Sequence, residues 1–261
     1  MEKILITGGT GTLGRKLVPG LLGAGYTVRL MSRGPRRASF PPEVEWVRAK
    51  LASGEGLGEG LREVDTVIHA ATAPFAVARV DVEGTRKLLG AAAPLGVRHF
   101  LYISIVGVDA HPFGYYRAKF AAENLIREAG VPWTILRATQ FHELLDKVFL
   151  PPLMRLPVAW VPTDFKFQVM DAGEAAARML QLVQAGPSGL VADIGGPEVR
   201  TMGDLAQGWL RAHGMKKKVV HWKMPGGAAR AFREGVNTCP AAKYGKITWE
   251  DYLAQNYDFS Q

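Results

Sequence analysis

The stretch that decides the fold is KILITGGTGTLGR, residues 3–15. Its first five residues form a short, mainly apolar run that ends at glycine, which is typical of a buried strand. Gly8, Gly11 and Gly14 then fit the spacing G-x-x-G-x-x-G, and Gly9 forms an overlapping G-x-G-x-x-G with the last two. The first glycine permits a tight turn, the middle one lets backbone approach a pyrophosphate, and the last lets the next helix pack closely on the strand. The stretch therefore predicts a dinucleotide-binding turn.

The helix that follows this turn presents its first N–H groups and the positive end of its dipole to an anion. Hydroxyl groups of nearby threonines can add hydrogen bonds to the same anion. We therefore predict that the cofactor contacts of the loop come from Thr7, Gly8, Gly11, Thr12, Leu13 and Gly14.

Further apolar, β-rich runs follow along the chain, with helix-like segments between most of them. The runs are 27–31, 44–48, 65–70, 98–104, 132–137 and 189–194, and the helix-like segments are 14–22, 82–93, 118–129, 172–185 and about 201–213. Strands that alternate with helices form a parallel sheet buried on both faces. The predicted fold is therefore α/β, a Rossmann-type doubly wound parallel sheet with helices on both faces.

The 261 residues, of which 48% are hydrophobic, are enough for one domain with a sizeable core. We expect a single domain, 1–261, with residues 1–138 as the dinucleotide-binding core. Residues 139–261 are expected to be mainly a small substrate-capping region that returns one late strand, near 189–194, to the sheet. Within it the apolar, Pro-rich stretch 149–162 suits an irregular cap.

The place of the protein in the cell is predicted from its cysteine content and its apolar segments. The single Cys239 cannot form an intrachain disulfide, no signal peptide is expected, and no stretch reaches the roughly 20 apolar residues that span a bilayer. We expect a cytoplasmic protein without a membrane partner.

The net charge of +8 is unevenly distributed. Residues 1–42 contribute +6 and the other 219 residues only +2, and no acidic residue lies between Glu2 and Glu43. This pattern predicts an anion site near the glycine loop, and it gives no case for nucleic acid. The run of lysines at 216–218 is short and is interpreted as a solvated helix end.

The end of the second predicted strand specifies the type of dinucleotide. An Asp or Glu there would bind the adenosine ribose hydroxyls, but the sequence is Ser32-Arg33-Gly-Pro-Arg-Arg37. Arginine pairs with phosphate through charge-assisted hydrogen bonds, so we predict that Ser32, Arg33 and Arg37 accept a 2′-phosphate and that NADP(H) is preferred over NAD(H). Lys50, at the end of the third strand, is expected to add to this positive rim.

Tyr115 and Lys119 lie four residues apart and so share one face of the predicted helix. A free phenol has a pKa of about 10, and a neighbouring ammonium stabilises the phenolate and lowers that pKa. The pair is therefore a candidate for proton transfer.

At this point the sequence resembles the short-chain dehydrogenase/reductase superfamily, and most closely its atypical NmrA-like, NAD(P)H-binding members. The resemblance covers most of the chain and rests on TGGTGTLG (7–14), HAAT (69–72), DVEGTRKLL (81–89), YISIVGVD (102–109), YYRAK (115–119), LRATQFHE (136–143) and TWEDYL (248–253). It implies that Ala70, Ala71 and Thr72 lie along the cofactor. It also implies that Tyr115 is the proton donor or acceptor, and that Lys119 holds the nicotinamide ribose.

Two departures from the family pattern concern the site. Ile105 follows Ser104 where the family usually has a second serine, so the hydroxyl that polarises the substrate is either Ser104 or missing. The third strand lacks the acid that often lies at the adenine edge.

The substrate side is also assigned by the resemblance, to Gln140, Phe141 and His142 at the exit of the sixth strand. His142 could deliver a proton, although a hydrogen-bonded pocket histidine without a chemical role is the more ordinary interpretation. Apolar cap residues suit an aromatic or apolar substrate or simply pack as core: Phe149, Leu150, Leu153, Met154 and Trp160. The histidines show no metal-ligand spacing, so no metal site is expected.

The predicted function is therefore an NADPH-dependent oxidoreductase that reduces a small, apolar carbonyl, quinone or enone. Two alternatives stay open. One is a redox-sensing regulator of NmrA type that binds NADP(H) without turnover. The weaker one is a nucleotide-sugar epimerase or dehydratase, for which the chain is short. A homodimer is a further expectation from the resemblance.

Overall fold

A computed structural model describes residues 2–73, 78–155 and 157–257. Its central feature is a seven-stranded sheet of order β3-β2-β1-β4-β5-β6-β9. The strands are β1 (Lys3–Thr7), β2 (Thr27–Ser32), β3 (Glu45–Arg48), β4 (Thr66–His69), β5 (His99–Ile105), β6 (Trp133–Ala138) and β9 (Gly189–Leu190). β1 pairs in parallel with β2 and β4, β2 with β3, β4 with β5, and β6 with β9. The predicted Rossmann-type sheet is confirmed.

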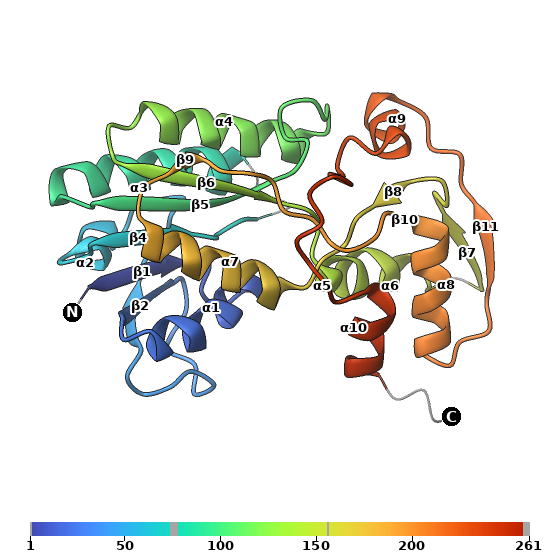
Figure 1. The fold of residues 1–261 in the computed structure, drawn as a ribbon, viewed down its shortest axis with the longest axis horizontal. Helices are drawn as coiled ribbons and strands as arrows, with labels where there is room; N and C mark the ends of the chain where they lie inside the picture. The colour runs from blue at the N-terminus through green and yellow to red at the C-terminus, as the bar shows by residue number, and fades with distance from the viewer. Residues whose placement is uncertain (1, 74–77, 156, 258–261) are drawn as a thin grey trace. The chain divides into compact units, whose positions relative to one another are not determined.

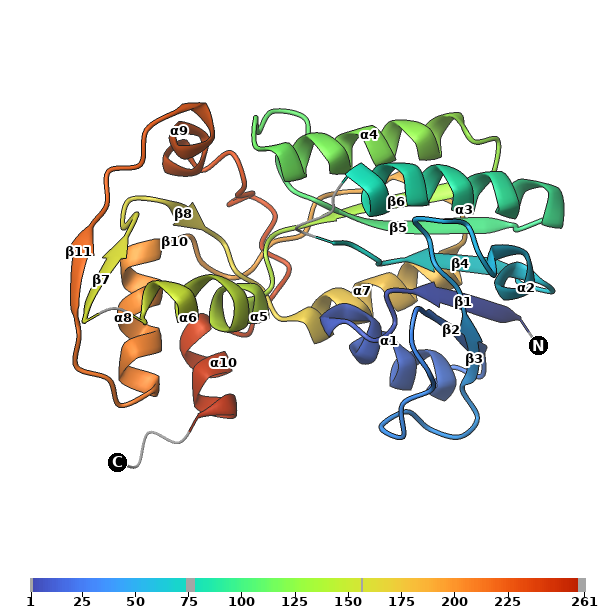
Figure 2. The same ribbon diagram turned by 180° about the vertical axis from the view of Figure 1, so that it is seen from behind.

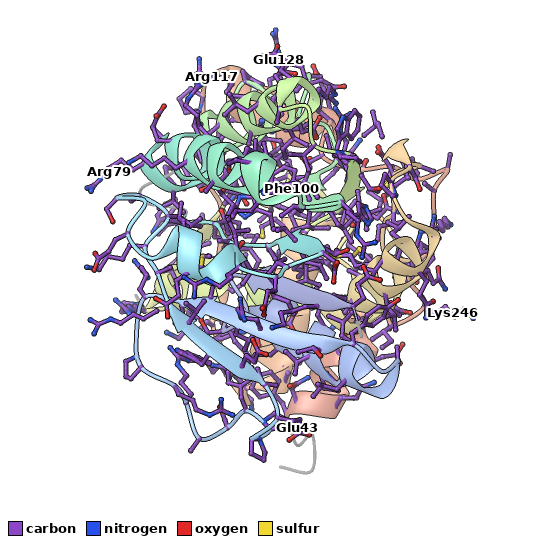
Figure 3. The ribbon with its side chains drawn as sticks, turned by 90° about the vertical axis from the view of Figure 1, so that its left-hand side faces the viewer. Glu43, Arg79, Phe100, Arg117, Glu128 and Lys246 are labelled. Carbon is purple, nitrogen blue, oxygen red and sulfur yellow. The ribbon has the colours of Figure 1, made fainter. Side chains whose placement is uncertain are left out.

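Helices cover both faces of this sheet (Figures 1 and 2). α1 (Thr12–Gly23) and α7 (Ala172–Ala185) lie on one face, and α2 (Leu57–Leu61), α3 (Thr85–Ala92) and α4 (Gly114–Glu128) lie on the other. The second layer buries a continuous apolar core that includes Leu5, Phe100 and Ile126. Figure 3 shows Phe100 inside this layer, whereas Arg79 and Arg117 lie at its periphery.

The ends of some elements differ from the prediction. The strand expected over 189–194 is only two residues long, and an isolated bridge between Ala138 and Ile194 replaces its second half. The helix expected over 82–93 begins earlier, as the π-helix η1 (Ala78–Gly84), continues as α3 and closes with the short η2 (Ala93–Leu95). Periodicity of apolar residues locates an element, but it does not fix the hydrogen-bond pattern at its ends.

The chain divides into two compact units. Unit 1 consists of Met1–Ser104, Gly114–Leu136 and Ala176–Val191, and contains the glycine loop and most of the sheet. Unit 2 consists of Ile105–Phe113, Arg137–Ala175 and Ala192–Gln261. The chain therefore passes between the units several times, and α7 starts in unit 2 and ends in unit 1.

Unit 2 is built from short elements. These are α5 (His142–Leu144), η3 (Leu145–Phe149), α6 (Leu150–Leu153), β7 (Val158–Val161), β8 (Lys166–Phe167), β10 (Arg200–Thr201), α8 (Met202–Ala212), β11 (Lys218–His221), α9 (Gly227–Glu234) and α10 (Trp249–Asn256). β10 pairs with β8 antiparallel and β11 with β7 parallel. The expectation of an irregular cap over 149–162 is wrong for its described part, because this stretch contains α6 and β7; Leu156 lies outside the described residues.

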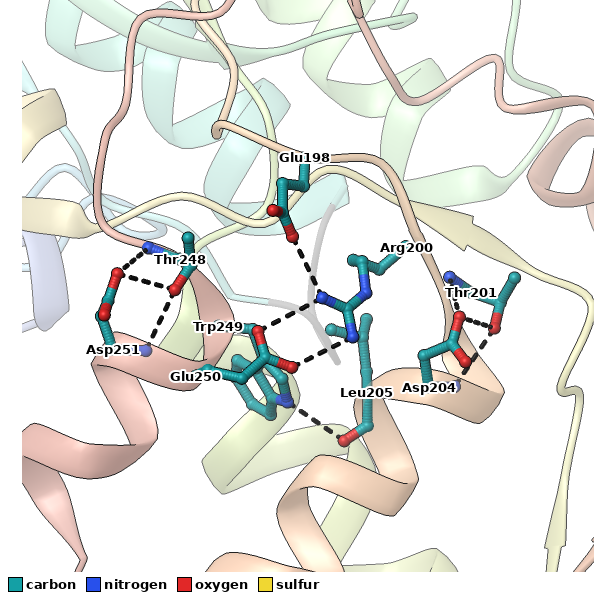
Figure 4. A network of polar contacts seen from close by, with 9 residues as sticks. All are labelled: Glu198, Arg200, Thr201, Asp204, Leu205, Thr248, Trp249, Glu250 and Asp251. Atoms are coloured by element: carbon teal, nitrogen blue, oxygen red, sulfur yellow. Dashed lines mark hydrogen bonds and ion pairs between the residues drawn. The ribbon is translucent and has the colours of Figure 1, made fainter.

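Two capping boxes start the longer helices of unit 2 (Figure 4). Thr201 and Asp204 form one box on α8, and Thr248 and Asp251 form the same arrangement on α10. The Trp249 indole donates a hydrogen bond to the Leu205 carbonyl at 3.1 Å. This bond ties α10 to α8 inside the apolar core of the unit.

A buried carboxylate also organises unit 2. Asp146 accepts hydrogen bonds from the Trp209 indole at 2.8 Å, the Tyr252 hydroxyl at 2.8 Å and the Tyr257 hydroxyl at 2.7 Å. Three donors offset the cost of burying the charge.

Within the described residues, none of the helices has the length and apolar character needed to cross a bilayer.

Candidate dinucleotide-binding and catalytic site

The glycine loop packs directly on the turn that follows β4. Gly8 has φ +71°, and a Cβ there would lie 2.6 Å from both the Ala70 carbonyl oxygen and the Ala71 nitrogen. A Cβ on Gly14 would lie 2.4 Å from the Gly9 Cα, so helix and strand approach as the motif predicts. The structure thus brings the loop and the Ala70-Ala71 turn together.

The start of α1 is free of the groups that usually satisfy a helix N-terminus. Gly11 is the N-cap, no side chain of the described residues caps the helix, and the first turn contains no acidic residue. Gly11 and Thr12 are exposed, whereas the Leu13 side chain is buried. Unsatisfied N–H groups at a helix start bind anions, so this end of α1 fits a pyrophosphate. Leu13 can contribute only its backbone N–H.

The hydroxyl of Thr7 is not available for a cofactor. Thr7 is fully buried and its Oγ1 lies 2.6 Å from His69 Nδ1, while His69 Nε2 lies 2.8 Å from Thr85 Oγ1. Burial lowers the pKa of His69 to about 3, so this imidazole is neutral. The expectation of a Thr7 hydroxyl contact is corrected, because this hydroxyl holds β1 to β4 instead.

Arg33 and Arg37 follow β2, whose last residue is Ser32, at the sheet edge where the glycine loop leaves β1. Both arginines are exposed, and neither guanidinium has a hydrogen-bond or ion-pair partner in the described parts of the chain. Ser32 Oγ accepts a hydrogen bond from the Gly34 N–H at 3.3 Å. Arg36, in contrast, donates to the carbonyls of Val44 and Pro41 and shapes the loop.

Other cations near the N-terminus are neutralised by acids from later segments. Lys50 pairs with Glu55 at 2.7 Å, which corrects the expectation that it joins the positive rim. Lys3 and Arg29 both pair with Glu45, at 3.3 and 2.6 Å. The excess charge of residues 1–42 is therefore concentrated on fewer side chains than the sequence suggests.

Tyr115 lies in the first turn of α4 and contacts a buried acid through Thr72. The Thr72 hydroxyl donates to Asp81 Oδ1 at 2.7 Å and lies 3.4 Å from the Tyr115 hydroxyl. The Ala73 N–H donates to the other Asp81 oxygen at 3.1 Å. Burial raises the pKa of Tyr115 to about 12, the hydrogen bond with Thr72 opposes this, and the Asp81 carboxylate adds to it. The expected lowering of this pKa by Lys119 is wrong for the chain's own residues.

Lys119 is buried one turn further along α4. Its Nζ donates to the Ile103 carbonyl at 2.8 Å and lies 4.3 Å from the centre of the Tyr102 ring. Burial lowers the pKa of Lys119, and the Asp81 and Glu123 carboxylates oppose that shift. The contacts fix the ammonium beside the end of β5.

Ser104 and Tyr102 on β5 hold hydroxyl groups without partners. Both side chains are buried, and neither hydroxyl has a hydrogen bond within the residues that the structure describes. A buried hydroxyl without a partner costs free energy and often marks a functional position. Ser104 therefore fits the predicted substrate-polarising role better than a packing role.

The predicted substrate residues belong to unit 2. Gln140 is buried and accepts a long hydrogen bond, 3.4 Å, from Asn237, and Phe141 forms an isolated bridge with Met170. His142 has no exposed surface and packs its ring on Tyr252, with 4.9 Å between ring centres. Burial lowers the pKa of His142 to about 4. The alternative in which His142 delivers a proton does not suit an enclosed, neutral imidazole, and the expectation of a hydrogen-bonded histidine is corrected, because neither ring nitrogen has a hydrogen-bond partner among the described residues.

The cap residues divide into two groups. Leu150 and Met154 are core residues of unit 2, whereas Phe149 and Trp160 are exposed. Over the described ranges, no cluster of three or more His, Cys, Asp or Glu side chains could hold a metal ion.

Asp81 is a residue of the candidate site that the sequence pattern does not single out. It is a buried acid that bonds to Thr72 and acts electrostatically on both Tyr115 and Lys119. The signal was present in the motif DVEGTRKLL, where Asp81 is the first acidic residue after Asp65. Its partner on the turn after β4 is nine residues away, and only the fold shows that contact.

Comparison with known protein families identifies the family of this chain. Residues 8–146, more than half of the chain, match the NAD(P)H-binding family. The chain belongs to the NAD(P)H-binding family. This membership confirms the resemblance seen in the sequence and gives the chain a nicotinamide dinucleotide as its cofactor. The glycine loop and the uncapped start of α1 fit that group.

This NAD(P)H-binding chain has curated relatives with different roles. Photosystem II assembly factor Ycf39 of Cyanophora paradoxa is 30% identical over 168 residues, which cover 62% of this chain and 52% of the relative. The (4-alkanoyl-5-oxo-2,5-dihydrofuran-3-yl)methyl phosphate reductase of Streptomyces griseus is 35% identical over 142 residues, which cover 53% of this chain and 48% of the reductase. The chain spans between half and three fifths of the length of the curated relatives it matches first.

Among solved structures, the NADPH-dependent quinone oxidoreductase QOR2 of Escherichia coli, complexed with NADPH, has a TM-score of 0.77 and 19% identity. The match covers 97% of this chain and 99% of that one. The NAD(P)H-binding chain therefore shares its whole fold with this oxidoreductase.

Proposed function

We propose that the protein is an NADPH-dependent reductase of a small, apolar carbonyl, quinone or enone. The observation that carries the proposal is the pair formed by Tyr115 and Lys119 on α4, with the Tyr115 hydroxyl held near Thr72. The glycine loop and the start of α1 would hold the pyrophosphate. Lys119 would bind the nicotinamide ribose.

Tyr115 would carry the proton that a reduction consumes. When bound, the nicotinamide supplies a hydride equivalent, and the protein must supply the proton that completes a two-electron reduction. A phenol with a pKa raised to about 12 is protonated at neutral pH, so Tyr115 is ready to donate a proton to the oxygen of a reduced substrate. Ser104 would orient the same oxygen through its unpartnered hydroxyl.

The test is NADPH oxidation by the wild type against a panel of quinones, enones and aldehydes, compared with Tyr115→Phe. We expect turnover with at least one class, and a loss of kcat of about 100-fold or more in the variant, since positioned proton transfer contributes on the order of 10²–10⁴-fold. Tyr26→Phe is the matched control, because Tyr26 is a partly buried tyrosine of unit 1 in the β2 region. Equal activity of wild type and Tyr115→Phe would refute the role of Tyr115.

A second candidate is a regulator that binds NADP(H) without turnover. Two observations favour it: Ile105 occupies the place of the family's second serine, and the pKa of Tyr115 is raised well above the range of an efficient acid or base. Tight binding of NADPH and NADP⁺ with unequal affinity, together with no turnover across the panel, would support this candidate against the reductase.

The preference for NADP(H) is a separate part of the proposal. Its support is the pair of exposed, unpaired guanidinium groups of Arg33 and Arg37 beyond β2. We expect Arg33→Ala to weaken NADPH binding by about tenfold and to leave NADH binding unchanged, since a hydrogen bond to a charged group contributes on the order of 1.5 kcal/mol or more. Arg62→Ala is the control, because Arg62 is an exposed arginine that precedes the amino end of β4, whereas the glycine loop lies at the carboxyl ends of the strands. Equal affinities of the wild type for NADPH and NADH would overturn the preference.

A further inference from the structure

The residues that the structure describes leave one face of the small parallel sheet in unit 2 uncovered. β7 and β11 pair in register, with Val220 opposite Trp160 and Val219 opposite Ala159. Ala159 and Val161 point inward and belong to the core that contains α8, and Val219 packs against the same core. Because side chains alternate along a strand, Trp160 and Val220 point to the opposite face.

This outward face is apolar and accessible. Trp160 is 51% exposed and Trp222, which follows β11 and donates its N–H to the Val161 carbonyl, is 44% exposed. Together with Pro152 and Leu153 of α6 they line an open depression of about 450 Å³. Parallel strands are normally buried on both faces, so a parallel pair with two tryptophans on a free face predicts a partner.

The surroundings of the depression are basic. The two segments that contain its lining residues, 147–163 and 205–233, hold nine Lys and Arg residues, but two of these are paired with adjoining acids, Arg233 with Asp164 at 3.8 Å and Arg230 with Glu234 at 3.9 Å. Lys217 donates to the Met154 carbonyl, which holds this part of the lysine run beside α6. Lys216, Lys218 and Lys223 are exposed and have no acidic partner in the parts of the chain that the structure describes. In the sequence the lysine run stands alone, whereas in the fold it leads into β11, which pairs with the strand of Trp160 and is followed by Trp222.

We infer that this surface, Pro152, Leu153, Trp160 and Trp222 with the lysines at 216, 218 and 223, attaches the protein to an anionic lipid bilayer. Tryptophan prefers the level of the lipid headgroups, aliphatic side chains enter the acyl boundary, and lysines bind anionic headgroups. Aliphatic Pro152 and Leu153 offer little to a nucleic acid base, which stacks on aromatic rings. The exposed lysines at 216, 218 and 223, which have no acidic partner among the described residues, favour an anionic surface. The inference is independent of the proposed reductase activity.

The first experiment measures co-sedimentation with two kinds of vesicle, one of phosphatidylcholine and one of equal parts phosphatidylcholine and phosphatidylglycerol. We expect the full chain to bind the mixed vesicles, to lose binding as salt rises, and to bind the neutral vesicles at least tenfold more weakly. Intrinsic tryptophan fluorescence should shift to shorter wavelength on binding, because Trp160 and Trp222 leave water.

Two pairs of variants separate the apolar and basic contributions. The double variant Trp160→Ala with Trp222→Ala should bind at least tenfold more weakly, and Leu95→Ser with Leu190→Ser is the control, since these leucines are 47% and 46% exposed in unit 1. Lys216→Glu with Lys218→Glu should also lose at least tenfold. Its control is Arg79→Glu with Arg117→Glu, two exposed arginines of unit 1 (Figure 3).

Circular dichroism and thermal unfolding of each variant establish that it is folded, and NADPH titration reports unit 1 separately. Failure of the wild type to bind mixed vesicles overturns the inference, as does vesicle binding that the tryptophan pair leaves unchanged. Tight binding to a single-stranded oligonucleotide, or a dimer that the tryptophan variants dissociate, with no vesicle binding, would assign the surface to another partner and equally overturn it.

Discussion

The replacement of Gly8 by alanine tests the geometry on which the dinucleotide site depends. Gly8 has φ +71°, and a left-handed conformation costs an L-residue about 1–2 kcal/mol. The new Cβ would also lie 2.6 Å from the Ala70 oxygen and the Ala71 nitrogen. Both are backbone atoms that cannot rotate away, so the loop or the turn must shift, and such overpacking costs about 1–3 kcal/mol. We expect Gly8→Ala to lower the free energy of unfolding by about 2–5 kcal/mol.

Gly11→Ala is the informative comparison. Gly11 has no positive φ, and the nearest atom to a new Cβ is the Gly8 oxygen at 3.2 Å, so the stability cost should stay below about 1 kcal/mol. Gly11 is nevertheless the exposed N-cap of α1, where a pyrophosphate must approach the backbone. We expect this variant to be stable but to bind NADPH at least tenfold more weakly. Gly8→Ala should lose both stability and binding.

The assay combines urea unfolding, followed by circular dichroism, with fluorescence titration of NADPH. Gly90→Ala serves as the control, because Gly90 lies in α3 and a Cβ there would meet nothing within 4 Å. It should gain about 0.5–1 kcal/mol, the helical advantage of alanine over glycine, and keep its affinity. The reasoning is refuted if Gly8→Ala is as stable as the wild type, or if Gly11→Ala binds NADPH normally.

Three further predictions follow from buried polar groups. Asp81→Asn removes a negative charge that raises the pKa of Tyr115, so the alkaline limb of a pH–rate profile for kcat should move to lower pH; an unchanged profile would count against this coupling. Asp146→Ala leaves three donors, two of them buried, without their acceptor and should destabilise the protein by about 3 kcal/mol or more in urea unfolding, whereas a loss below about 1 kcal/mol would contradict the network. In the folded protein the pKa values of His69 and His142 are lowered to about 3 and 4. The unfolded state, in which a histidine has a pKa of about 6.5, therefore binds more protons below that pH. The free energy of unfolding should fall as pH drops from 6.5 toward 4, by roughly 1.4 kcal/mol per pH unit for each histidine. His142→Leu should reduce that slope, and a slope equal to that of the wild type would show that His142 is protonated in the folded protein.

The sequence predicted the sheet well because its signals are local. The order of strand, glycine turn and helix in residues 3–15 determines both the element types and the place of the anion site. The same holds for the capping box of Thr201 and Asp204, in which both partners lie within one turn. The small strands β7 and β11 were missed, because each is four residues long and gains its strand character only from the other, about 60 residues away.

The candidate site was predictable in its residues but not in their electrostatics. Tyr115 and Lys119 are four apart on one helix, which the sequence shows directly. Their protonation depends on burial and on Asp81, and both are consequences of the fold. The neighbouring ammonium predicted a lowered tyrosine pKa, whereas desolvation raises the pKa of Tyr115, because removing a phenolate from water costs more than the hydrogen bond with Thr72 returns.

The net charge of a sequence segment differs from the charge that the folded protein exposes at one place on its surface. The first 42 residues hold +6, yet two of their seven cations, Lys3 and Arg29, pair with the Glu45 carboxylate. Residues 43–261 hold only +2, yet the segment around β11 carries three exposed lysines, at 216, 218 and 223, that have no acidic partner within the described residues. The protein therefore has two basic places for two different anions, and each can be changed without the other. Arg33→Ala should weaken NADPH binding and leave vesicle binding intact, and Lys216→Glu with Lys218→Glu should do the reverse; a variant of one place that impaired both functions would show that the two places are coupled.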